Sequence, residues 1–558
     1  MTTLSASPVA RRMGGLDIAA VAIAVPLAIP VATVAASVFA GGGAVIAHLA
    51  QTVLGDYVAN TAALGLLVAI GVLAIGVPAA WLTAACEFPG RRFLEAALVL
   101  PLAAPAYVLA YAYTDLLDSY GPVQGALRAA TGWQTGEYWF PQIRSLPGAA
   151  LMLILVLYPY VYLLARARFL SESATALDAA RVLGRGPWRA FFSVSLPLAR
   201  PALAAGTALA LMETFADYGT VSYFGVPVFT LGIYRTWFSF GDPVAAAQLA
   251  AILIGFVAVV LAAERFARGQ ARFHEPGRRD RRPERLALAP LQSAGAIIAC
   301  GLPPVFGFVI PALVLGELLL GTQGPTRDFM VHLVNSVTLA GLAGVLAAAA
   351  ALVLATARRE NPQGVAARAA GLAGLGYAVP GAVIAIGVLI PFAAFDNAVD
   401  AAMRDLFGVS TGLLLTGGIA ALVFAYLVRF LAVALQSVGA GLERITPSVS
   451  GAARMLSRGP LDALLRVHAP MIAPSALTAA LIVFVDVMKE LPATLMLRPF
   501  DFDTLAVAAH NYAADERLAN AAAPSLAIVA AGMLPCILLI RIVAAAAGAR
   551  EERPLPLP

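Results

Sequence analysis

The sequence predicts an all-α integral membrane protein of about 12 transmembrane helices, arranged as two parallel six-helix repeats. Three observations predict it: the composition, a series of long apolar stretches and an internal repeat. The chain has 558 residues, of which 60% are hydrophobic and 12% charged, and its mean hydropathy is +0.84. Ordinary globular proteins carry about a quarter charged residues. This composition excludes a water-soluble protein, because too few charges remain to cover its exterior, so much of the surface must face lipid.

Twelve apolar stretches approach the length of roughly 20 residues that a spanning helix needs. The first runs too far, without a convincing small-residue cleavage site, to be a cleavable signal peptide, so we interpret it as the first transmembrane helix. The stretches are roughly 16–39, 60–84, 94–114, 148–168, 201–223, 247–267, 291–318, 332–357, 367–394, 411–437, 474–497 and 523–547.

Arginine collects in alternate short loops, which predicts the orientation because cytoplasmic loops carry an excess of basic residues. With twelve spans, these loops all lie on one side, so we expect a multi-pass protein of the inner (plasma) membrane with both termini in the cytoplasm. The arginines concerned are Arg11, Arg12, Arg91, Arg92, Arg166, Arg168, Arg181, Arg185, Arg189 and Arg200, then Arg358, Arg359, Arg368, Arg444, Arg454, Arg458 and Arg466.

The most polar segment lies between the sixth and seventh spans and runs from Glu264 to Leu286, with eight arginines, four acids and two prolines. Clustered arginines can bind anionic headgroups, but a solvated tether on the cytoplasmic side is the simpler interpretation, and we adopt it. The expected domains are therefore residues 1–267, a cytoplasmic linker at 268–290 and residues 291–558.

Two loops repeat each other. Residues 178–197 read DAARVLGRGPWRAFFSVSLP, and residues 451–470 read GAARMLSRGPLDALLRVHAP. The offset between these loops also aligns Pro201 with Pro474, so the register continues into the next span. An even number of spans separates the copies, which predicts parallel halves related by an axis along the membrane normal.

The loop pattern resembles the EAA loop of permease subunits of binding-protein-dependent ABC importers. The first copy matches at Asp178, Ala179, Ala180, Gly184, Leu196 and Pro197. The second copy keeps Ala452, Ala453 and Pro470 but has Gly451 in place of the acid, Ser457 in place of the glycine and Ala469 before the proline. The resemblance implies that both loops form short coupling helices that dock on a separate ATPase. Small alanines permit close approach of a partner, a glycine permits a turn, and Pro197 suits the start of the next span.

Longer segments narrow the resemblance. LPLAAPAYVLAYAYTDLL from Leu100, METFADYGTVSYFGVPVFTLGIYRTW from Met212, GYAVPGAVIAIG from Gly376 and FVDVMKELPATLMLRPFDFDTLA from Phe484 look like the fused, two-domain iron(III) ABC permeases. This resemblance implies a type I importer fold, two copies of a cytoplasmic ATP-binding subunit, and a periplasmic binding protein that delivers ferric iron. Related permeases for thiamine, polyamines and phosphonates share much of this framework and remain alternatives.

Ionisable residues inside spans are costly and indicate function. Glu213 and Asp217 are spaced i, i+4, as are Asp486 and Glu490, and the offset of the repeated loops makes the pairs equivalent. The spacing predicts that each pair shares one helix face. With Lys489, the four carboxylates give a central path a formal charge of −3, which suits a cation.

Hard Fe(III) prefers oxygen ligands, so Tyr218 and Tyr223 are candidate additional donors. Transient contact with Fe(III) is expected at Asp217 and Glu490. The competing interpretation of Lys489 is an internal ion pair that serves packing or gating. Pro492, which lacks an amide donor, is expected to end or bend the helix just beyond Glu490.

Several features are missing from the sequence. A GxxxxGK[ST] phosphate-binding loop requires a lysine, and Lys489, in VMKELP, is the single lysine. We therefore expect a permease subunit without enzymatic activity or cofactor, with ATP and Mg²⁺ bound by the partner ATPase. The longest outer loop, about 115–147, is too short for a substrate-capturing domain. Acids that we consider for docking of the binding protein, or as solvated charges, are Asp115, Asp118, Glu137, Asp396, Asp400, Asp501 and Asp503.

Other classes of protein fit less well. A secondary transporter with two parallel halves would also show repeats, but the paired EAA-like loops argue against it. A membrane enzyme would need convergent catalytic groups, whereas the five histidines are dispersed. A nucleic-acid partner is not expected, because the basic excess of +5 records membrane orientation. Cys86, Cys300 and Cys536 lack metal or disulfide spacing and are interpreted as small buried residues.

Overall fold

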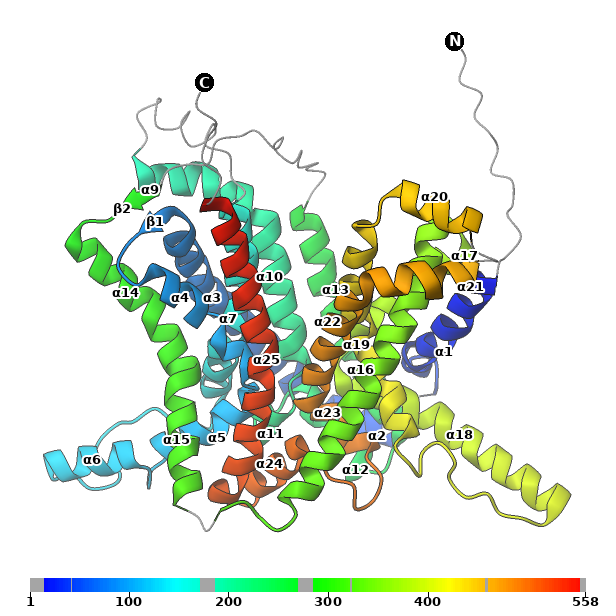
Figure 1. Ribbon diagram of the computed structural model, residues 1–558. Coiled ribbons are helices and arrows are strands. Elements are labelled where there is room, and N and C mark those ends of the chain that lie inside the picture. Colours follow the sequence, from blue (N-terminus) through cyan, green and yellow to red (C-terminus); the bar gives the residue numbers. More distant parts are fainter. Residues whose placement is uncertain are drawn as a thin grey trace, which may run out of the picture.

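The computed structural model describes residues 15–41, 43–170, 186–268, 285–321, 324–456 and 460–551. Within these ranges the chain is almost entirely helical (Figure 1). Long helices are the expected solution for an apolar chain in lipid, because a helix satisfies its own backbone hydrogen bonds. The two short strands, β1 (Cys86–Glu87) and β2 (Leu286–Ala287), form one parallel pair. The all-α prediction is confirmed.

The two halves are built from similar elements in a similar order, although the elements do not match one for one. The first half comprises α1 (Gly15–Ser37), α2 (Ala44–Thr52), α3 (Leu54–Ala85), α4 (Arg91–Ala97), η1 (Leu100–Ala103), α5 (Ala106–Leu117), α6 (Pro122–Thr131), α7 (Leu146–Leu170), α9 (Pro187–Ala190), η2 (Phe191–Ser195), α10 (Leu196–Ala216), α11 (Gly219–Tyr223), α12 (Phe229–Phe238) and α13 (Pro243–Arg268). The second comprises α14 (Pro290–Pro304), η3 (Val305–Val309), α15 (Ile310–Leu320), α16 (Phe329–Glu360), α17 (Val365–Ala373), η4 (Gly374–Ala378), α18 (Gly381–Phe407), α19 (Ala420–Glu443), α20 (Pro447–Leu456), α21 (Pro460–Ala463), η5 (Leu464–His468), α22 (Ala469–Met488), α23 (Pro492–Leu497), α24 (Leu505–Ala514) and α25 (Leu518–Glu551).

The repeat found in the sequence persists in the backbone. Each EAA-like loop leads into a π-helical turn, η2 or η5, and the two turns begin at equivalent positions of the repeat, Phe191 and Leu464. Pro197 and Pro470 lie in the first turn of α10 and α22 directly afterwards. A proline ring clashes with the carbonyl four residues earlier, and a wider π turn relieves that clash. The prediction that Pro197 marks the start of the next span agrees with the bounds of α10.

The two halves interlock. Helix α1 of the first half packs against α17 and α18 of the second, while α14 and α15 pack against α3, α4 and α5 of the first. At the point where the described chain resumes, β2 pairs with β1, and Arg285 forms an ion pair with Glu87 at 3.3 Å. The core is therefore shared between the halves. The domain boundaries proposed above remain a prediction, and residues 269–284 of the linker lie outside the described residues.

Within the described ranges, 11 helices are long and apolar enough to cross a membrane, or 12 with the bent pair Arg91–Ala103 and Ala106–Thr131. The predicted count is confirmed, but four predicted spans, 94–114, 201–223, 367–394 and 474–497, are not continuous helices. Helix α10 ends at Ala216 and α22 at Met488, and the short helices α11 and α23 follow each break. These breaks lie at the site.

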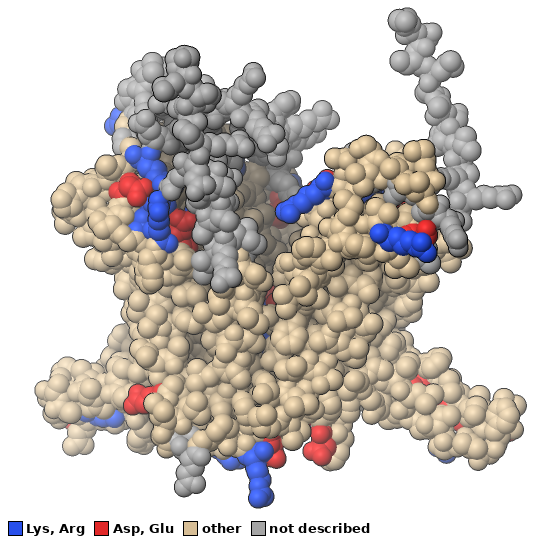
Figure 2. Space-filling view, viewed as in Figure 1, with Lys and Arg blue, Asp and Glu red and all other residues tan. Residues whose placement is uncertain are grey.

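Figure 2 shows that Lys and Arg gather mostly at the end of the molecule that carries α9 and α20, where the two halves part. The opposite end carries α11, α12, α23 and α24 and bears fewer basic residues. This distribution is the one that the loop arginines predicted, and we refer to the two ends below as the arginine-rich end and the outer end.

Candidate functional site: a charged cavity between two broken helices

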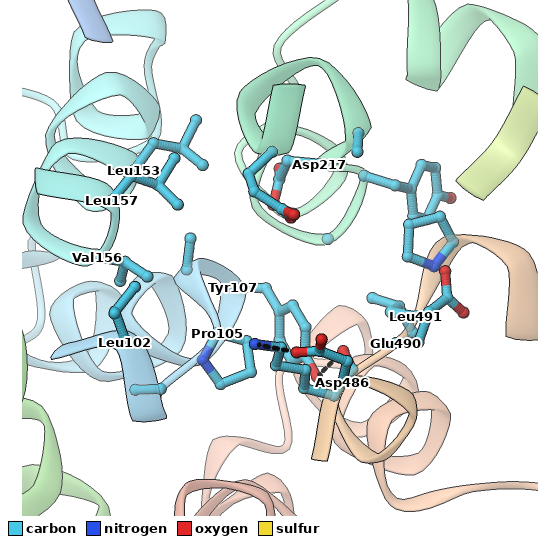
Figure 3. Close-up of a pocket in the computed structure, with 18 of the residues that line it drawn as sticks. Leu102, Pro105, Tyr107, Leu153, Val156, Leu157, Asp217, Asp486, Glu490 and Leu491 are labelled. Carbon is cyan, nitrogen blue, oxygen red and sulfur yellow. Dashed lines mark hydrogen bonds and ion pairs between the residues drawn. The ribbon is translucent and has the colours of Figure 1, made fainter. Parts of the chain in front are cut away.

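A cavity of about 110 Å³ lies between the halves, where four helices are interrupted. The breaks between α10 and α11 and between α22 and α23 face it, together with the non-helical joint that follows η1 and with Tyr377 of η4. Irregular backbone at membrane depth is tolerated where it lines a cavity. All six residues predicted for a path line this cavity: Glu213, Asp217, Tyr218, Asp486, Lys489 and Glu490. Figure 3 labels Asp217, Asp486 and Glu490 among them. That substrate passes between them stays a prediction.

Asp217 caps the short helix that follows the first break. The backbone amides of Thr220 and Val221 donate to Asp217 Oδ2, both at 3.1 Å, and the Thr220 hydroxyl donates to Oδ1 at 3.0 Å. Its own backbone is extended, with φ −66° and ψ 132°. The prediction that Glu213 and Asp217 share one face of a continuous helix is therefore wrong, because the helix ends between them. The carboxylate satisfies the free amides at the start of α11.

Glu490 does the same at the equivalent position. The amide of Ala493 donates to Glu490 Oε1 at 2.9 Å, and the amide and hydroxyl of Thr494 donate to Oε2 at 3.0 and 2.7 Å. Asp486 and Glu490 are likewise separated by a break rather than carried on one face. Pro492 does interrupt this segment, but α22 has already ended at Met488, and the proline opens α23 instead. A proline suits that position because its missing amide would be unpaired there.

Arg429 of α19 was not among the predicted site residues. Its guanidinium Nη1 lies 3.1 Å from Glu490 Oε1, and Nη2 lies 3.9 Å from Glu213 Oε2 of the other half. With Arg429, the lining carries four carboxylates and two cations, so the formal charge is −2 rather than the predicted −3. The signal was present in the sequence: Arg429 interrupts the apolar run FAYLVRFLAV, and an arginine inside a span is a functional candidate.

The remaining charges are more accessible. Lys489 Nζ forms an ion pair with Asp486 Oδ1 at 2.9 Å, so the predicted internal pair exists. Glu213 Oε1 accepts a hydrogen bond from the Tyr377 hydroxyl at 3.1 Å. The Glu213 and Asp486 side chains are 30% and 19% exposed, whereas Glu490 is 2% exposed. Glu213 and Asp486 are repeat equivalents, and each holds a partly free carboxylate at the cavity.

Two tyrosines of the first half that line the cavity, Tyr107 and Tyr218, belong to a set of aromatic contacts around the second break. The hydroxyl of Tyr107 donates to the Lys489 carbonyl at 3.3 Å, and that of Tyr234 donates to the Pro492 carbonyl, so residues of the first half bind the second break. Tyr218 stacks on Tyr234 with ring centroids 3.8 Å apart. Tyr223, a predicted oxygen donor, does not line this cavity and lies beside Arg144 instead.

The predicted coupling residues are only partly described. Asp178, Ala179, Ala180, Gly184 and Ser457 lie outside the described residues. Gly451, Ala452 and Ala453 lie in α20, at the arginine-rich end. Large apolar side chains are exposed toward the end of both EAA-like loops, among them the repeat equivalents Phe192 of η2 and Leu465 of η5, at 64% and 58%.

A second repeated pair was missed by the sequence reasoning. Asn60 donates to the Pro227 carbonyl and Asn335 to the Asp503 carbonyl, both at 3.0 Å. The next residues, Thr61 and Ser336, accept from the first amides of α12 and α24 at 3.3 and 2.8 Å. In both halves these side chains hold the loop that follows the broken helix. An Asn-Thr and an Asn-Ser dipeptide in apolar surroundings, separated by nearly the offset of the EAA-like loops, were the available signal.

The predicted metal contacts can also be located. Among the described residues, no group of three or more His, Cys, Asp or Glu is arranged to hold a metal ion. Asp217 and Glu490, where transient contact was expected, use their oxygens for helix caps. The cavity therefore presents single carboxylates rather than a resident metal centre.

Comparisons with known proteins show which proteins the chain is similar to. Residues 76–267 match the family of the binding-protein-dependent transport system inner membrane component. The chain is 24% identical over 495 residues to the Fe(3+)-transport system permease protein FbpB 2 of Haemophilus influenzae, which covers 87% of this chain and 90% of that protein. Residues 76–267 thus carry the inner membrane component of a binding-protein-dependent transport system.

Shorter similarities connect the chain to other transport system permeases. It is 30% identical over 152 residues to the molybdenum transport system permease protein ModB of Escherichia coli, which covers 27% of this chain and 63% of that protein. It is 32% identical over 157 residues to the sulfate transport system permease protein CysW of the same species, covering 28% and 51%. In this chain, the matched family region extends from within α3 to the end of α13, so it contains the first broken helix and its cap.

Proposed function

We propose that this permease carries ferric iron from a periplasmic binding protein through the cavity into the cytoplasm. The observation that carries the proposal is the charge of the cavity, where carboxylates of both halves outnumber the two cations and leave a formal −2. Such a lining favours a cation over an oxyanion, and carboxylate oxygens suit hard Fe(III).

The relatives support iron more than the alternatives. The protein named for Fe(3+) transport aligns with 87% of this chain, and therefore with parts of both halves. Those named for molybdenum and sulfate align with 27% and 28%. Because the cavity is built by both halves, similarity across both is the more informative about substrate. Thiamine, a polyamine and a phosphonate remain the alternatives to test.

Within the cavity we assign different tasks to the two pairs of acids. Glu213 and Asp486 are partly exposed and belong to opposite halves, so we assign them the transient contacts with the ion. Asp217 and Glu490 hold the breaks open and add negative potential, and any contact with the ion would have to compete with their caps. Lys489 balances Asp486 and keeps the ion from binding too firmly to leave.

ATP hydrolysis belongs to two copies of a cytoplasmic ATP-binding subunit, each bound at one EAA-like loop. The exposed, repeat-equivalent side chains Phe192 and Leu465 support this assignment, since exposed apolar patches mark protein interaction sites. ATP and Mg²⁺ are then held by that subunit, with no cofactor in this chain. The arginine-rich end, with both termini, is the cytoplasmic end.

The coupling assignment is tested by Phe192→Asp and Leu465→Asp. Each charge would oppose burial at the ATPase contact, so copurification of the ATPase and ATP-dependent uptake should both fall. Phe192→Tyr, which keeps an aromatic surface, is the matched control and should behave as the parent. Parental uptake in both Asp variants would remove these loops from the ATPase contact.

The substrate is tested by reconstituting the permease with its ATPase and binding protein in liposomes. We expect ATP-dependent uptake of Fe(III) and no uptake of molybdate, sulfate, thiamine, a polyamine or a phosphonate under the same conditions. Uptake of an oxyanion or thiamine without iron would overturn the substrate assignment. Gradient-driven uptake without nucleotide would overturn the dependence on ATP.

A further inference from the structure

Two segments leave the helical bundle near its outer end. The first arm, residues 118–145, contains α6 and connects α5 to α7. The second arm, residues 395–419, contains the last turns of α18 and the return to α19. Figure 1 shows that the arms extend sideways, on opposite sides of the bundle, and not beyond the loops at its outer end. They therefore project into the zone where a membrane surrounds the bundle.

The first arm is a small folded unit that exposes aromatic rings. The Tyr138 hydroxyl donates to Gln124 Oε1 at 2.7 Å and accepts from Arg128 at 3.0 Å, which ties the return segment to α6. Trp133 stacks on Tyr138 with ring centroids 5.8 Å apart. Outside these contacts, Tyr120 is 97% exposed and Trp139 is 86% exposed. Between residues 119 and 143 the only charged residues are Arg128 and Glu137.

In the second arm two of the three acids, Asp396 and Asp400, are used internally, the third, Asp405, is exposed, and apolar side chains lie outside. Asp396 is fully buried and accepts from the amides of Leu415 and Thr416 at 3.0 and 2.9 Å. Asp400 accepts from the amide of Thr411 at 2.8 Å. Neither acid is thus available for the docking role considered from sequence. The large apolar side chains left exposed are Phe395, Leu406, Phe407, Val409, Leu413 and Leu414.

We propose that both arms lie in the headgroup region of the outer leaflet and bind the bilayer surface. Three features indicate that lipid is what contacts the two arms. The arms project sideways at the depth of the bundle, and their exposed residues continue the apolar wall of the spans. Apart from the exposed Asp405, their charged side chains hold hydrogen bonds or ion pairs. Exposed Trp and Tyr with few charges are the composition of a membrane interface belt. A binding protein approaching the substrate cavity would instead meet the outer loops between the halves.

The test uses fluorescence of single-tryptophan variants of the full permease in phosphatidylcholine nanodiscs. One variant keeps Trp139 alone of the five tryptophans, and a second carries Phe407→Trp in a tryptophan-free background. We expect loss of emission in both with lipids brominated near the headgroup, a smaller loss with lipids brominated near the acyl chain end, and little loss with aqueous iodide. A variant that keeps only Trp81, which is 5% exposed, is the buried control, and its emission should be quenched by neither the brominated lipids nor iodide.

Two outcomes would overturn the proposal. Strong quenching of both the Trp139 variant and the Phe407→Trp variant by iodide, without an effect of brominated lipid, would place the arms in water. Protection from iodide that requires the binding protein, again without lipid quenching, would make the arms a protein docking surface. None of these readouts depends on the transported substrate, so the test stands apart from the iron assignment.

Discussion

The break after α10 and the break after α22 share a backbone design but differ in charge. At both, a carboxylate at the equivalent position of the repeat caps the following short helix through two amides and a threonine hydroxyl. Only Glu490 has a guanidinium beside it, because the second half has Arg429 where the first half has Val156. Asp217 has no cation among the hydrogen bonds and ion pairs of the described residues.

The difference shows that duplication preserved the scaffold while the chemistry of the halves diverged. The capping acids are needed wherever a spanning helix is interrupted, because free amides in an apolar region are costly. The cations are not required by that scaffold. Arg429 and Lys489, both in the second half, instead adjust the charge of a shared cavity, and Arg429 connects Glu490 with Glu213 across the halves.

The largest expected effect follows from removing Arg429. Arg429→Met should destabilise the protein by about 3–5 kcal/mol, because it leaves the buried Glu490 carboxylate without its partner. Val156→Ala, at the equivalent position, should cost less, about 2 kcal/mol or below, since it only shortens an apolar side chain. Thermal unfolding of the purified variants in one detergent measures both.

The double variant Arg429→Met with Glu490→Gln separates charge from packing. If the unpaired carboxylate is the cause, the second substitution should recover part of the lost stability, although each change alone is harmful. Equal unfolding temperatures for Arg429→Met and the parent would show that the pair at 3.1 Å contributes nothing measurable.

Substitution of the capping acid should likewise have a larger effect in the second half, at Glu490, than in the first, at Asp217. Glu490→Gln loses a charged hydrogen bond acceptor and its ion pair, whereas Asp217→Asn keeps a good capping side chain and breaks no ion pair. We therefore expect Glu490→Gln to lower transport and stability clearly and Asp217→Asn to do so weakly. Parental transport in both variants would remove these acids from the path, and a stronger effect of Asp217→Asn would reverse the comparison.

Gly381 tests how closely the second break is packed. A Cβ there would touch Arg429 Nη1 and lie 2.7 Å from Glu490 Oε1. Gly381→Ala should therefore cost about 1–3 kcal/mol through overpacking and displacement of the ion pair. Gly255→Ala in α13, where a Cβ meets nothing within 4 Å, is the matched control and should be neutral or slightly stabilising. Equal unfolding temperatures for the two variants would contradict the tight contact.

Much of the fold was predictable, because spans, arginine-rich loops and a long internal repeat leave strong sequence signals. The six residues that line the cavity were also predictable, since ionisable groups are rare in spans. The breaks were not, because an i, i+4 spacing of Glu213 and Asp217 fits a continuous helix as well as an interrupted one. Pro492 marks the second break, but its equivalent, Gly219, gives no comparable signal. Pairing of Arg429 with Glu490 depends on helix packing that no local pattern records.

The smallest effect concerns the outer end, where the halves meet through exposed charges. Arg144 Nη1 and Nη2 donate to Glu516 Oε1 and Oε2 at 2.7 and 2.9 Å. These hydrogen bonds hold the pKa of the Glu516 carboxyl below its ordinary value of 4.5. A lowered pKa means that the stabilisation is present at neutral pH and is lost as the pH falls through the folded-state value. Because Glu516 is 60% exposed, the effect should be small.

We expect Glu516→Gln to remove only this acid-dependent part of the stability. Unfolding temperatures of parent and variant should differ slightly at pH 7 and converge as the pH falls below about 4. A constant difference across that pH range would show that the carboxylate charge is not involved.

The central claim is that Glu213 and Asp486, one from each half, contact a cation in the shared cavity. The most direct measurement is ATP-dependent uptake of radiolabelled Fe(III) by the Glu213→Gln, Asp486→Asn double variant, with binding-protein-stimulated ATP hydrolysis recorded in the same liposomes. We predict that uptake is lost while ATP hydrolysis continues. Iron uptake at the parental rate in the double variant would contradict the claim.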